Sequence, residues 1–430
     1  MKLGKALSYV SGFVVARGAL FIAPILLANL LTLDSYGAIE RAQAIAALTA
    51  LIVGFGLPAS VPLILLRPEV SARWDTLLLI VLTVSALAFV VAIGAFMINQ
   101  RGLSPGVLIP VSVGMLLLQS TWSGALKAKG RLNTALFLEA GFWFFTAIGA
   151  VVSILLAMSD DWIVLWLWLY ASALWAVALR AYKRGRSPFK FADVQENIQL
   201  GVPLLTATIF TLLATSSGRY VLAFTADAET VGVYSVLYRA TALPIVGHQI
   251  LTVAFFRQIY TWNIDDLKRR SPLIPVGVFG FVVSFWVLAD PLGWMLGAKF
   301  EELFVQFRFV GLIILSQTIL WSAISLNDMV NARIQITAAV ARLSFPILLA
   351  GMSLLFATVL ISEPESLQRN LVMVTVGQSL LMGVYYLIQC FSMVSKGGVF
   401  WRLWSTVGAT YSLIILSIIG SAESFESLIV

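Results

Sequence analysis

The chain has 430 residues, of which 60% are hydrophobic and only 11% are charged. A water-soluble domain of average composition carries about 25% charged residues, so lipid must surround most of this protein. The formal net charge of +7 does not indicate a nucleic-acid partner, because the basic residues lie in short segments between apolar runs. One cysteine, Cys390, and one histidine, His248, exclude an internal disulfide and metal sites rich in these residues. The composition therefore predicts neither a metal nor a cofactor.

Apolar runs recur along the whole chain, and a helix needs about 20 such residues to cross the hydrocarbon. The strict alternation of barrel strands is not present in these runs. The first run contains Arg17 and continues into the next, which is not the pattern of a removable signal peptide. We predict an all-α integral membrane protein with thirteen transmembrane helices, over residues 7–33, 37–66, 75–98, 105–126, 133–157, 162–182, 198–224, 230–256, 272–296, 302–325, 334–361, 367–394 and 403–420.

Basic residues fall on alternate loops when the N-terminus is placed in the cytoplasm. Nineteen then lie in cytoplasmic segments, and only Arg101, Lys299 and Arg369 lie outside, where acidic residues predominate. A single miscounted span would invert every later loop and remove this asymmetry. The distribution predicts a multi-pass protein of a bacterial inner membrane, with a cytoplasmic N-terminus and a periplasmic C-terminus.

A polar segment over residues 183–197 divides the predicted spans into two sets of six. It predicts an N-terminal lobe over 1–182, a cytoplasmic linker over 183–197, a C-terminal lobe over 198–395, and an additional helix with a tail over 396–430. The turns Asp34-Ser35-Tyr36-Gly37 and Glu229-Thr230-Val231-Gly232 occupy equivalent places in the two halves. Because each half has an even number of spans, we expect parallel repeats related by a pseudo-twofold axis along the membrane normal, with a cavity between them.

Three short segments carry a family resemblance: ANLLTLDSYG over 28–37, GVPLL over 201–205, and RYVL with VGVYS over 219–235. They resemble polysaccharide flippases of the Wzx type, in the multidrug/oligosaccharidyl-lipid/polysaccharide exporter superfamily. The resemblance covers roughly residues 1–395 and implies an alternating-access carrier. Its cargo would be an undecaprenyl-diphosphate-linked oligosaccharide for surface polysaccharide such as O-antigen, with membrane lipids and polysaccharide polymerase machinery as further partners. One departure is Gly218, since relatives often carry an acidic residue before the basic residue that is Arg219 here.

Basic residues outnumber acidic ones within the predicted spans. An ionisable group at that depth costs several kcal/mol unless it faces a cavity or a partner. Guanidinium groups bind phosphate through two parallel hydrogen bonds, which suits a diphosphate headgroup. We therefore interpret as candidates for substrate binding Arg17, Arg219, Arg239, Arg308 and Arg342.

Each of these charges also has an interpretation without function. Arg308 and Arg342 lie near span ends and can extend to the membrane surface, and Arg342 can pair with Asp328. Glu139 and Asp290 are candidates for binding a coupling ion. The alternatives are an ion pair with Arg131 or Lys129 for Glu139, a helix stop for Asp290, and a packing role for His248.

Three rival functions remain open at this point. An exporter of cationic drugs would be expected to line its cavity with carboxylates rather than arginines. A membrane glycosyltransferase or polymerase needs catalytic groups on a sizeable loop, and the adjacent acids Asp160-Asp161 and Asp265-Asp266 fit solvated loops instead. A lipid-precursor flippase for the cell wall typically has fourteen spans. No phosphate-cradling glycine loop that ends in Gly-Lys-Ser/Thr is present, so the chain does not hydrolyse nucleotides by that route. The sequence predicts a transporter rather than an enzyme.

Overall fold

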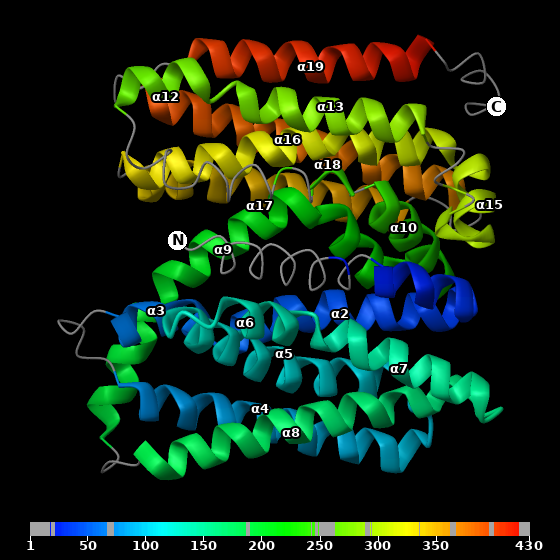
Figure 1. Ribbon diagram of the computed structural model, residues 1–430, viewed down its shortest axis with the longest axis vertical. Helices are drawn as coiled ribbons and strands as arrows, with labels where there is room; N and C mark the ends of the chain where they lie inside the picture. Colours follow the sequence, from blue (N-terminus) through cyan, green and yellow to red (C-terminus); the bar gives the residue numbers. More distant parts are fainter. Residues whose placement is uncertain are drawn as a thin grey trace, which may run out of the picture. The chain divides into compact units, whose positions relative to one another are not determined.

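The computed structural model of the chain describes residues 18, 22–66, 73–185, 190–241, 243–245, 248, 263–288, 293, 295–334, 336–361, 367–394 and 400–420. These residues form helices joined by short turns, as Figure 1 shows, which confirms the all-α prediction. Among them, nine helices are long and apolar enough to cross a membrane, or ten when a bent pair counts as one span. The total of thirteen stays a prediction, since the spans 7–33 and 230–256 lie partly outside the described residues.

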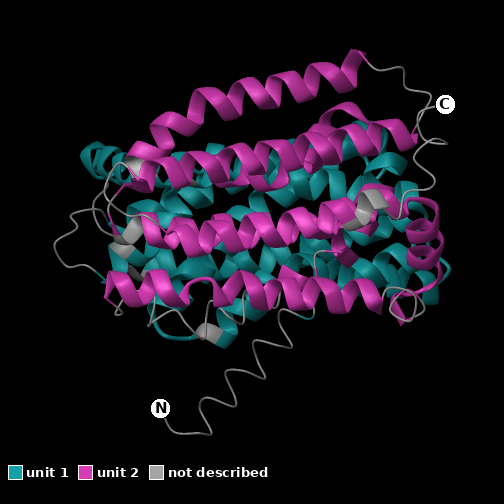
Figure 2. Cartoon of the chain, turned by 90° about the horizontal axis from the view of Figure 1, so that it is seen from above, with its two compact units in different colours: residues 1–209, 227–232 teal, residues 210–226, 233–430 magenta. Residues whose placement is uncertain are grey.

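The chain divides into two compact units, which Figure 2 shows in different colours. Unit 1 comprises residues 1–209 and 227–232, and unit 2 comprises 210–226 and 233–430. The boundary falls within the long helix α9 (Phe191–Thr225). Helix α8 ends at Gly185, so much of the predicted linker 183–197 is helical. The lobe boundaries of the sequence analysis remain a prediction.

Unit 1 is built around one buried helix. Its labelled elements before α9 are α2 (Leu33–Val53), α3 (Leu57–Leu66), α4 (Trp74–Asn99), α5 (Pro105–Ala128), α6 (Leu132–Glu139), α7 (Gly141–Leu155), η1 (Asp160–Trp162) and α8 (Ile163–Gly185). Helix α5 starts with Pro105, which is favoured at the first helical position because its missing N–H has no helical partner there. It packs against α2, α3, α4, α6 and α8, and 67% of its membrane-spanning window is buried.

The predicted span 37–66 is not one helix. Helix α2 ends at Val53 and α3 begins at Leu57, because Phe55 (φ 49°) and Gly56 (φ 68°) adopt left-handed backbone conformations. A Cβ on Gly56 would lie 2.4 Å from the carbonyl oxygen of Gly201 in α9, so the break also brings the two backbones together. Only glycine combines both properties without strain. The predicted span 133–157 is likewise divided, with a 53° bend between α6 and α7.

Unit 2 repeats the arrangement around a second buried helix. It contains the end of α9, most of α10 (Ala228–Thr241), α12 (Ile264–Arg270), α13 (Leu273–Val287), α15 (Ala298–Gln306), α16 (Arg308–Arg333), α17 (Thr337–Ile361), α18 (Leu367–Val394) and α19 (Trp401–Gly420). Helix α16 packs against α13, α15, α17, α18 and α19, and 83% of its spanning window is buried. Helices α5 and α16 correspond to the fourth and tenth predicted spans. These would be equivalent positions in the two predicted six-helix halves.

The two repeat turns of the sequence analysis are capped in the same register. The Thr32 hydroxyl oxygen accepts from the Ser35 amide at 3.1 Å, and the Asp227 carboxylate accepts from the Thr230 amide at 2.7 Å. Each cap residue lies five positions before a glycine, Gly37 or Gly232. The caps are therefore Thr32 and Asp227, rather than the acidic residues that drew attention to these turns. A side-chain oxygen at this place satisfies an amide that the first helical turn leaves unpaired.

Candidate functional site in unit 2

A row of buried polar side chains follows the contact between α16 and α18. Gln317 and Asp328 lie on α16, and Gln378 and Gln389 lie on α18. In both helices the two positions are eleven residues apart (328 − 317 and 389 − 378), which is close to three turns and places them on one face. We call these four residues, with Thr211 and Thr215 of α9, the polar seam.

Gln378 completes the hydrogen bonding of a break in α9. Ser216 has φ −133° and ψ 17°, so the backbone around it cannot make regular helical bonds. The Gln378 amide donates to the carbonyl oxygen of Thr215 at 2.9 Å and accepts from the amide of Gly218 at 3.0 Å. Its oxygen also accepts from the Tyr234 hydroxyl at 2.9 Å. One buried amide side chain therefore satisfies the backbone groups that the break releases.

The same contact explains why position 218 lacks a side chain. A Cβ on Gly218 would lie 2.5 Å from the Gln378 oxygen and 2.9 Å from the Tyr234 hydroxyl. Any side chain at position 218, acidic or not, would clash with Gln378 or displace it. The next residue is Arg219, which is half-buried, so the break and its amide cap set the backbone from which this arginine extends.

Gln317 holds α16 to the neighbouring helix α18. Its amide nitrogen donates to the carbonyl oxygen of Thr375 at 2.8 Å and to the Ser379 hydroxyl at 3.0 Å. Its oxygen is buried and finds no hydrogen-bond donor among the described residues. Gln317, Gln378, Thr215 and Tyr238 line a small cavity of about 10 Å³. A space of that size is at the lower limit for a single water molecule.

Asp328 is the acidic member of the polar seam. Its carboxylate accepts from the Gln389 amide at 2.7 Å, and the hydroxyl groups of Tyr385 and Thr211 also hydrogen-bond to it. Asn327 and Asn331 flank it on α16, and each has a buried side-chain oxygen without a donor in the described part of the chain. An ionisable carboxylate thus lies within an apolar span and is held by hydrogen bonds from α9 and α18, a position at which such groups commonly serve transport.

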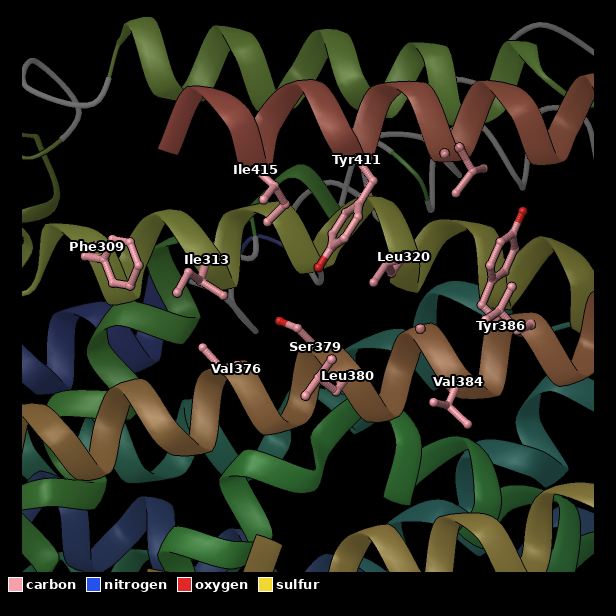
Figure 3. A pocket seen from close by; sticks show the side chains of 14 residues that line it. Phe309, Ile313, Leu320, Val376, Ser379, Leu380, Val384, Tyr386, Tyr411 and Ile415 are labelled. Atoms are coloured by element: carbon pink, nitrogen blue, oxygen red, sulfur yellow. The ribbon is translucent and has the colours of Figure 1, made fainter. Parts of the chain in front are cut away.

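The single histidine has a packing environment. His248 is buried, its Nδ1 lies 2.7 Å from the Ser322 hydroxyl oxygen, and its ring meets that of Trp321 edge to face at 5.0 Å. These contacts fit the packing role that the sequence suggested. His248 lines neither the small cavity beside Gln317 nor the apolar groove between α18 and α19 (Figure 3).

The four described arginine candidates all belong to unit 2 but lie on four different helices. Arg219 of α9 and Arg239 of α10 are half-buried, whereas Arg308 of α16 and Arg342 of α17 are exposed. None of the four lines the small cavity beside Gln317 or the apolar groove between α18 and α19. Arg17 lies outside the described residues. The binding of one substrate by these five arginines therefore stays a prediction.

The two carboxylates predicted as coupling candidates have different outcomes. Glu139 forms an ion pair with Lys127 and accepts from the Ser123 hydroxyl at 2.6 Å. The ion pair is with Lys127, whereas the sequence suggested Arg131 or Lys129, and the coupling role stays a prediction. Asp290 lies outside the described residues. The adjacent acids of the loops are structural: Asp161 accepts from the Leu103 amide at 2.8 Å, and Asp265 and Asp266 lie in the first turn of α12.

The polar seam escaped the sequence analysis for an identifiable reason. The tenth span was predicted to end at residue 325, which left Asp328 in a loop, whereas α16 continues to Arg333 and its apolar span includes Asp328. The uncharged glutamines drew no attention because only ionisable groups were weighed. The matching eleven-residue spacing on two apolar helices was the available signal.

These features define a class of protein before any comparison: an all-helical, multi-pass membrane protein with polar groups buried inside a helical lobe. The chain belongs to the family of polysaccharide biosynthesis proteins, which it matches over residues 3–256, more than half of its length. No curated protein matches the sequence.

Two solved structures share the fold at low sequence identity. One is described as the lipid II flippase MurJ in an inward closed conformation, at 12% identity, with a TM-score of 0.63 over 99% of this chain and 100% of that chain. The other is described as an inward-facing multidrug resistance MATE family transporter of the MOP superfamily, at 14% identity, with a TM-score of 0.56 over 89% of this chain and 95% of that chain. The fold resemblance expected from the short motifs is thereby confirmed.

Proposed function

We propose that the protein is a flippase that moves a polyprenyl-diphosphate-linked oligosaccharide from the cytoplasmic to the periplasmic leaflet of a bacterial inner membrane. The observation that carries this proposal is family membership combined with the fold of a named lipid flippase along 99% of the chain. A step that belongs both to polysaccharide biosynthesis and to lipid translocation is the transfer of lipid-linked sugar units across the membrane.

Arginines inside the spans support an anionic cargo. Arg219 is half-buried on α9, which is long and apolar enough to cross a membrane, and Arg239 is half-buried on α10. Arg219 extends from the break in α9 that Gln378 caps. We assign diphosphate recognition to these two residues and to Arg17, because a guanidinium group offers paired donors to phosphate oxygens. Arg308 and Arg342 are exposed and take a supporting role in the proposal.

The energy source in this proposal is an ion gradient coupled through Asp328. This carboxylate lies within an apolar span and is surrounded by hydrogen-bonding groups from α9 and α18. Ionisable groups at such positions are costly and commonly serve transport. Glu139 is a weaker candidate because Lys127 already neutralises it.

The proposal is tested by following a fluorescent polyprenyl-diphosphate-linked aminosugar across vesicles that contain the purified protein, using a membrane-impermeant quencher. We expect Arg219→Ala and Arg239→Ala to slow translocation by about tenfold or more, which corresponds to ~1.4 kcal/mol of lost stabilisation. Arg219→Lys keeps the charge without the paired donors and should recover only part of the rate. Arg101→Ala, at an exposed loop position, is the matched control and should behave as the unmodified protein.

Full rates in both alanine variants would reject diphosphate recognition at these positions. The second candidate function is export of small cationic molecules, which the fold shared with a MATE family transporter favours. It predicts that the unmodified protein leaves the lipid-linked sugar in place and accumulates a cationic dye in inverted vesicles.

A further inference from the structure

The break in α9 is bridged by one side chain that both donates and accepts. The Gln378 amide nitrogen donates to the carbonyl oxygen of Thr215 at 2.9 Å, before the non-helical residue Ser216. The Gln378 oxygen accepts from the backbone amide of Gly218 at 3.0 Å, after that residue. It also accepts from the Tyr234 hydroxyl of α10 at 2.9 Å. We call Gln378, Gly218 and Tyr234 the α9 brace, because together they hold the two sides of the break.

The bonds of the α9 brace require an amide side chain at position 378. A glutamine presents N–H donors and a carbonyl acceptor on one carbon atom, whereas a carboxylate only accepts and a methionine offers at most a weak acceptor. Gln378 and Tyr234 are each only 1% exposed, so water does not replace a bond that is lost there. The backbone conformation at Ser216 therefore depends on the side chain of Gln378.

Helix α18 is itself fixed at the level of the brace. The Gln317 amide nitrogen of α16 donates to the Thr375 carbonyl oxygen at 2.8 Å and to the Ser379 hydroxyl at 3.0 Å, on either side of Gln378. Figure 3 shows Ser379 extending from α18 toward Tyr411 of α19, whose hydroxyl hydrogen-bonds to it. The helix that carries Gln378 is thus bonded to two neighbouring helices beside the brace, so Gln378 holds the break from a fixed support.

The residue whose direction the brace controls is Arg219. It follows Gly218 directly and lies within the first turn after Ser216. The direction in which a helical side chain extends follows from the backbone at its own position, so the conformation of the break decides where the guanidinium group lies. Arg219 also interacts electrostatically with Tyr234, a member of the brace. The brace therefore fixes both the backbone of this arginine and one of its neighbours.

Unit 1 contains a similar brace that no basic residue follows. At the 53° bend between α6 and α7, the Gln119 amide nitrogen donates to the Glu139 carbonyl oxygen at 2.9 Å. The Tyr170 hydroxyl donates to the Leu138 carbonyl oxygen at 3.0 Å, and a Cβ on Gly141 would lie 2.1 Å from that hydroxyl. The four residues after this glycine are aromatic. The combination of glutamine, tyrosine and glycine therefore holds a bend in both units, and only the brace of unit 2 is followed by an arginine.

We propose that Gln378 is a positioning residue, which acts through the α9 brace to hold Arg219 in the direction that binds the diphosphate of the cargo. This inference rests on the proposed function, which assigns diphosphate recognition to Arg219. A guanidinium group binds phosphate most strongly when two of its N–H groups face the phosphate oxygens together. An arginine on a rotated backbone keeps its charge but loses that paired geometry. Removal of the brace should therefore weaken binding only as long as Arg219 is present.

The test measures binding of undecaprenyl diphosphate without a sugar to the purified protein in lipid nanodiscs. Gln378→Met keeps the length of the side chain but removes its donor and its strong acceptor, and should weaken binding by about tenfold, equivalent to ~1.4 kcal/mol. The same substitution in Arg219→Ala protein should cause no further loss, because no guanidinium group remains to be positioned. Gln119→Met is the matched control, since it removes the corresponding bond in unit 1 and should bind as the unmodified protein does.

A loss of binding in Gln378→Met that disappears in the Arg219→Ala background, with an unchanged control, supports the positioning role. Losses that add in the double variant would overturn it, because the amide would then act independently of the arginine. Full binding by Gln378→Met would overturn it as well. If Gln378→Met does not fold, Tyr234→Phe decides by the same comparison: it removes one bond of the brace and should weaken binding about twofold only while Arg219 is present. A protein that binds undecaprenyl diphosphate and translocates the sugar lipid, yet shows additive losses, rejects the positioning role alone. Failure of the unmodified protein in both assays rejects the proposed function and the positioning role with it.

Discussion

At the scale of a single residue, a substitution at Asp328 tests the proposed ion coupling. Asp328→Asn keeps the size of the side chain and an oxygen that accepts from Gln389, but removes the ionisable group. We expect the variant to insert and to retain its melting temperature within a few degrees, while the stimulation of translocation by an imposed proton or sodium gradient is lost. The measurement compares translocation in vesicles with and without each gradient.

Glu139→Gln is the matched control for Asp328→Asn. It removes a carboxylate from an ion pair whose lysine is 44% exposed in its side chain, and such pairs contribute about 0–1 kcal/mol. Gradient stimulation should persist in this control. If Asp328→Asn still responds to both gradients and Glu139→Gln does not, the coupling site belongs to unit 1 and the assignment to the polar seam is wrong.

At the scale of the helical elements, the two repeat turns make a close backbone contact within unit 1. A Cβ on Gly37 would lie 1.7 Å from the carbonyl oxygen of Ala228, and a Cβ on Gly232 would lie 2.4 Å from that of Leu33. The contact is reciprocal, because each glycine meets the residue four positions before the other. The start of α2 and the start of α10 therefore pack backbone against backbone, and not even one methyl group fits between them at these positions.

We predict that Gly37→Ala lowers the melting temperature of the purified protein and slows translocation. Gly94→Ala, in α4, is the control with the opposite expectation: its Cβ enters open space, and alanine favours a helix over glycine by about 1 kcal/mol. Thermal unfolding in detergent measures the melting temperatures of both variants. A melting temperature of Gly37→Ala at or above that of the unmodified protein would show that the contact does not contribute to stability.

The bounds of several helices could be predicted from the sequence, but the break between α2 and α3 could not. Apolar runs placed α4, α5, α8 and α18 within a few residues, because lipid imposes a length on every span. Composition alone did not predict the break at Phe55-Gly56, which depends on a left-handed backbone and on the approach of Gly201 from another helix. Contacts of this kind arise from tertiary structure and leave only a pair of glycines as a local sign.

The candidate site was less accessible from sequence than the fold. Charged residues within the spans were noticed because burying a charge in hydrocarbon costs free energy, yet the four described arginine candidates lie on four separate helices. The amides of Gln317, Gln378 and Gln389 organise the interior of unit 2, and their role follows from backbone groups that only the folded chain exposes, such as those beside Ser216. The resemblance at Gly218 and Arg219 drew attention to the break in α9 but not to Gln378, which caps it.

At the scale of the whole molecule, the distribution of basic residues makes a prediction about topology that covers the spans outside the described residues. With thirteen spans and a cytoplasmic N-terminus, the segment between α8 and α9 is cytoplasmic and the C-terminus is periplasmic. Fusion to a fluorescent protein that matures only in the cytoplasm should therefore report at residue 188. Alkaline phosphatase, active only in the periplasm, should report at residue 102 and after residue 430.

The C-terminal fusion decides whether the number of spans is odd or even. An even number of spans, as in a chain of twelve or fourteen, would return the C-terminus to the cytoplasm and reverse the signals of that one fusion alone. Reversal of all three fusions would instead mean that the N-terminus is periplasmic. A flippase inserted that way would present its polar seam in the opposite direction, so the proposed movement from the cytoplasmic to the periplasmic leaflet depends on fluorescence at residue 188.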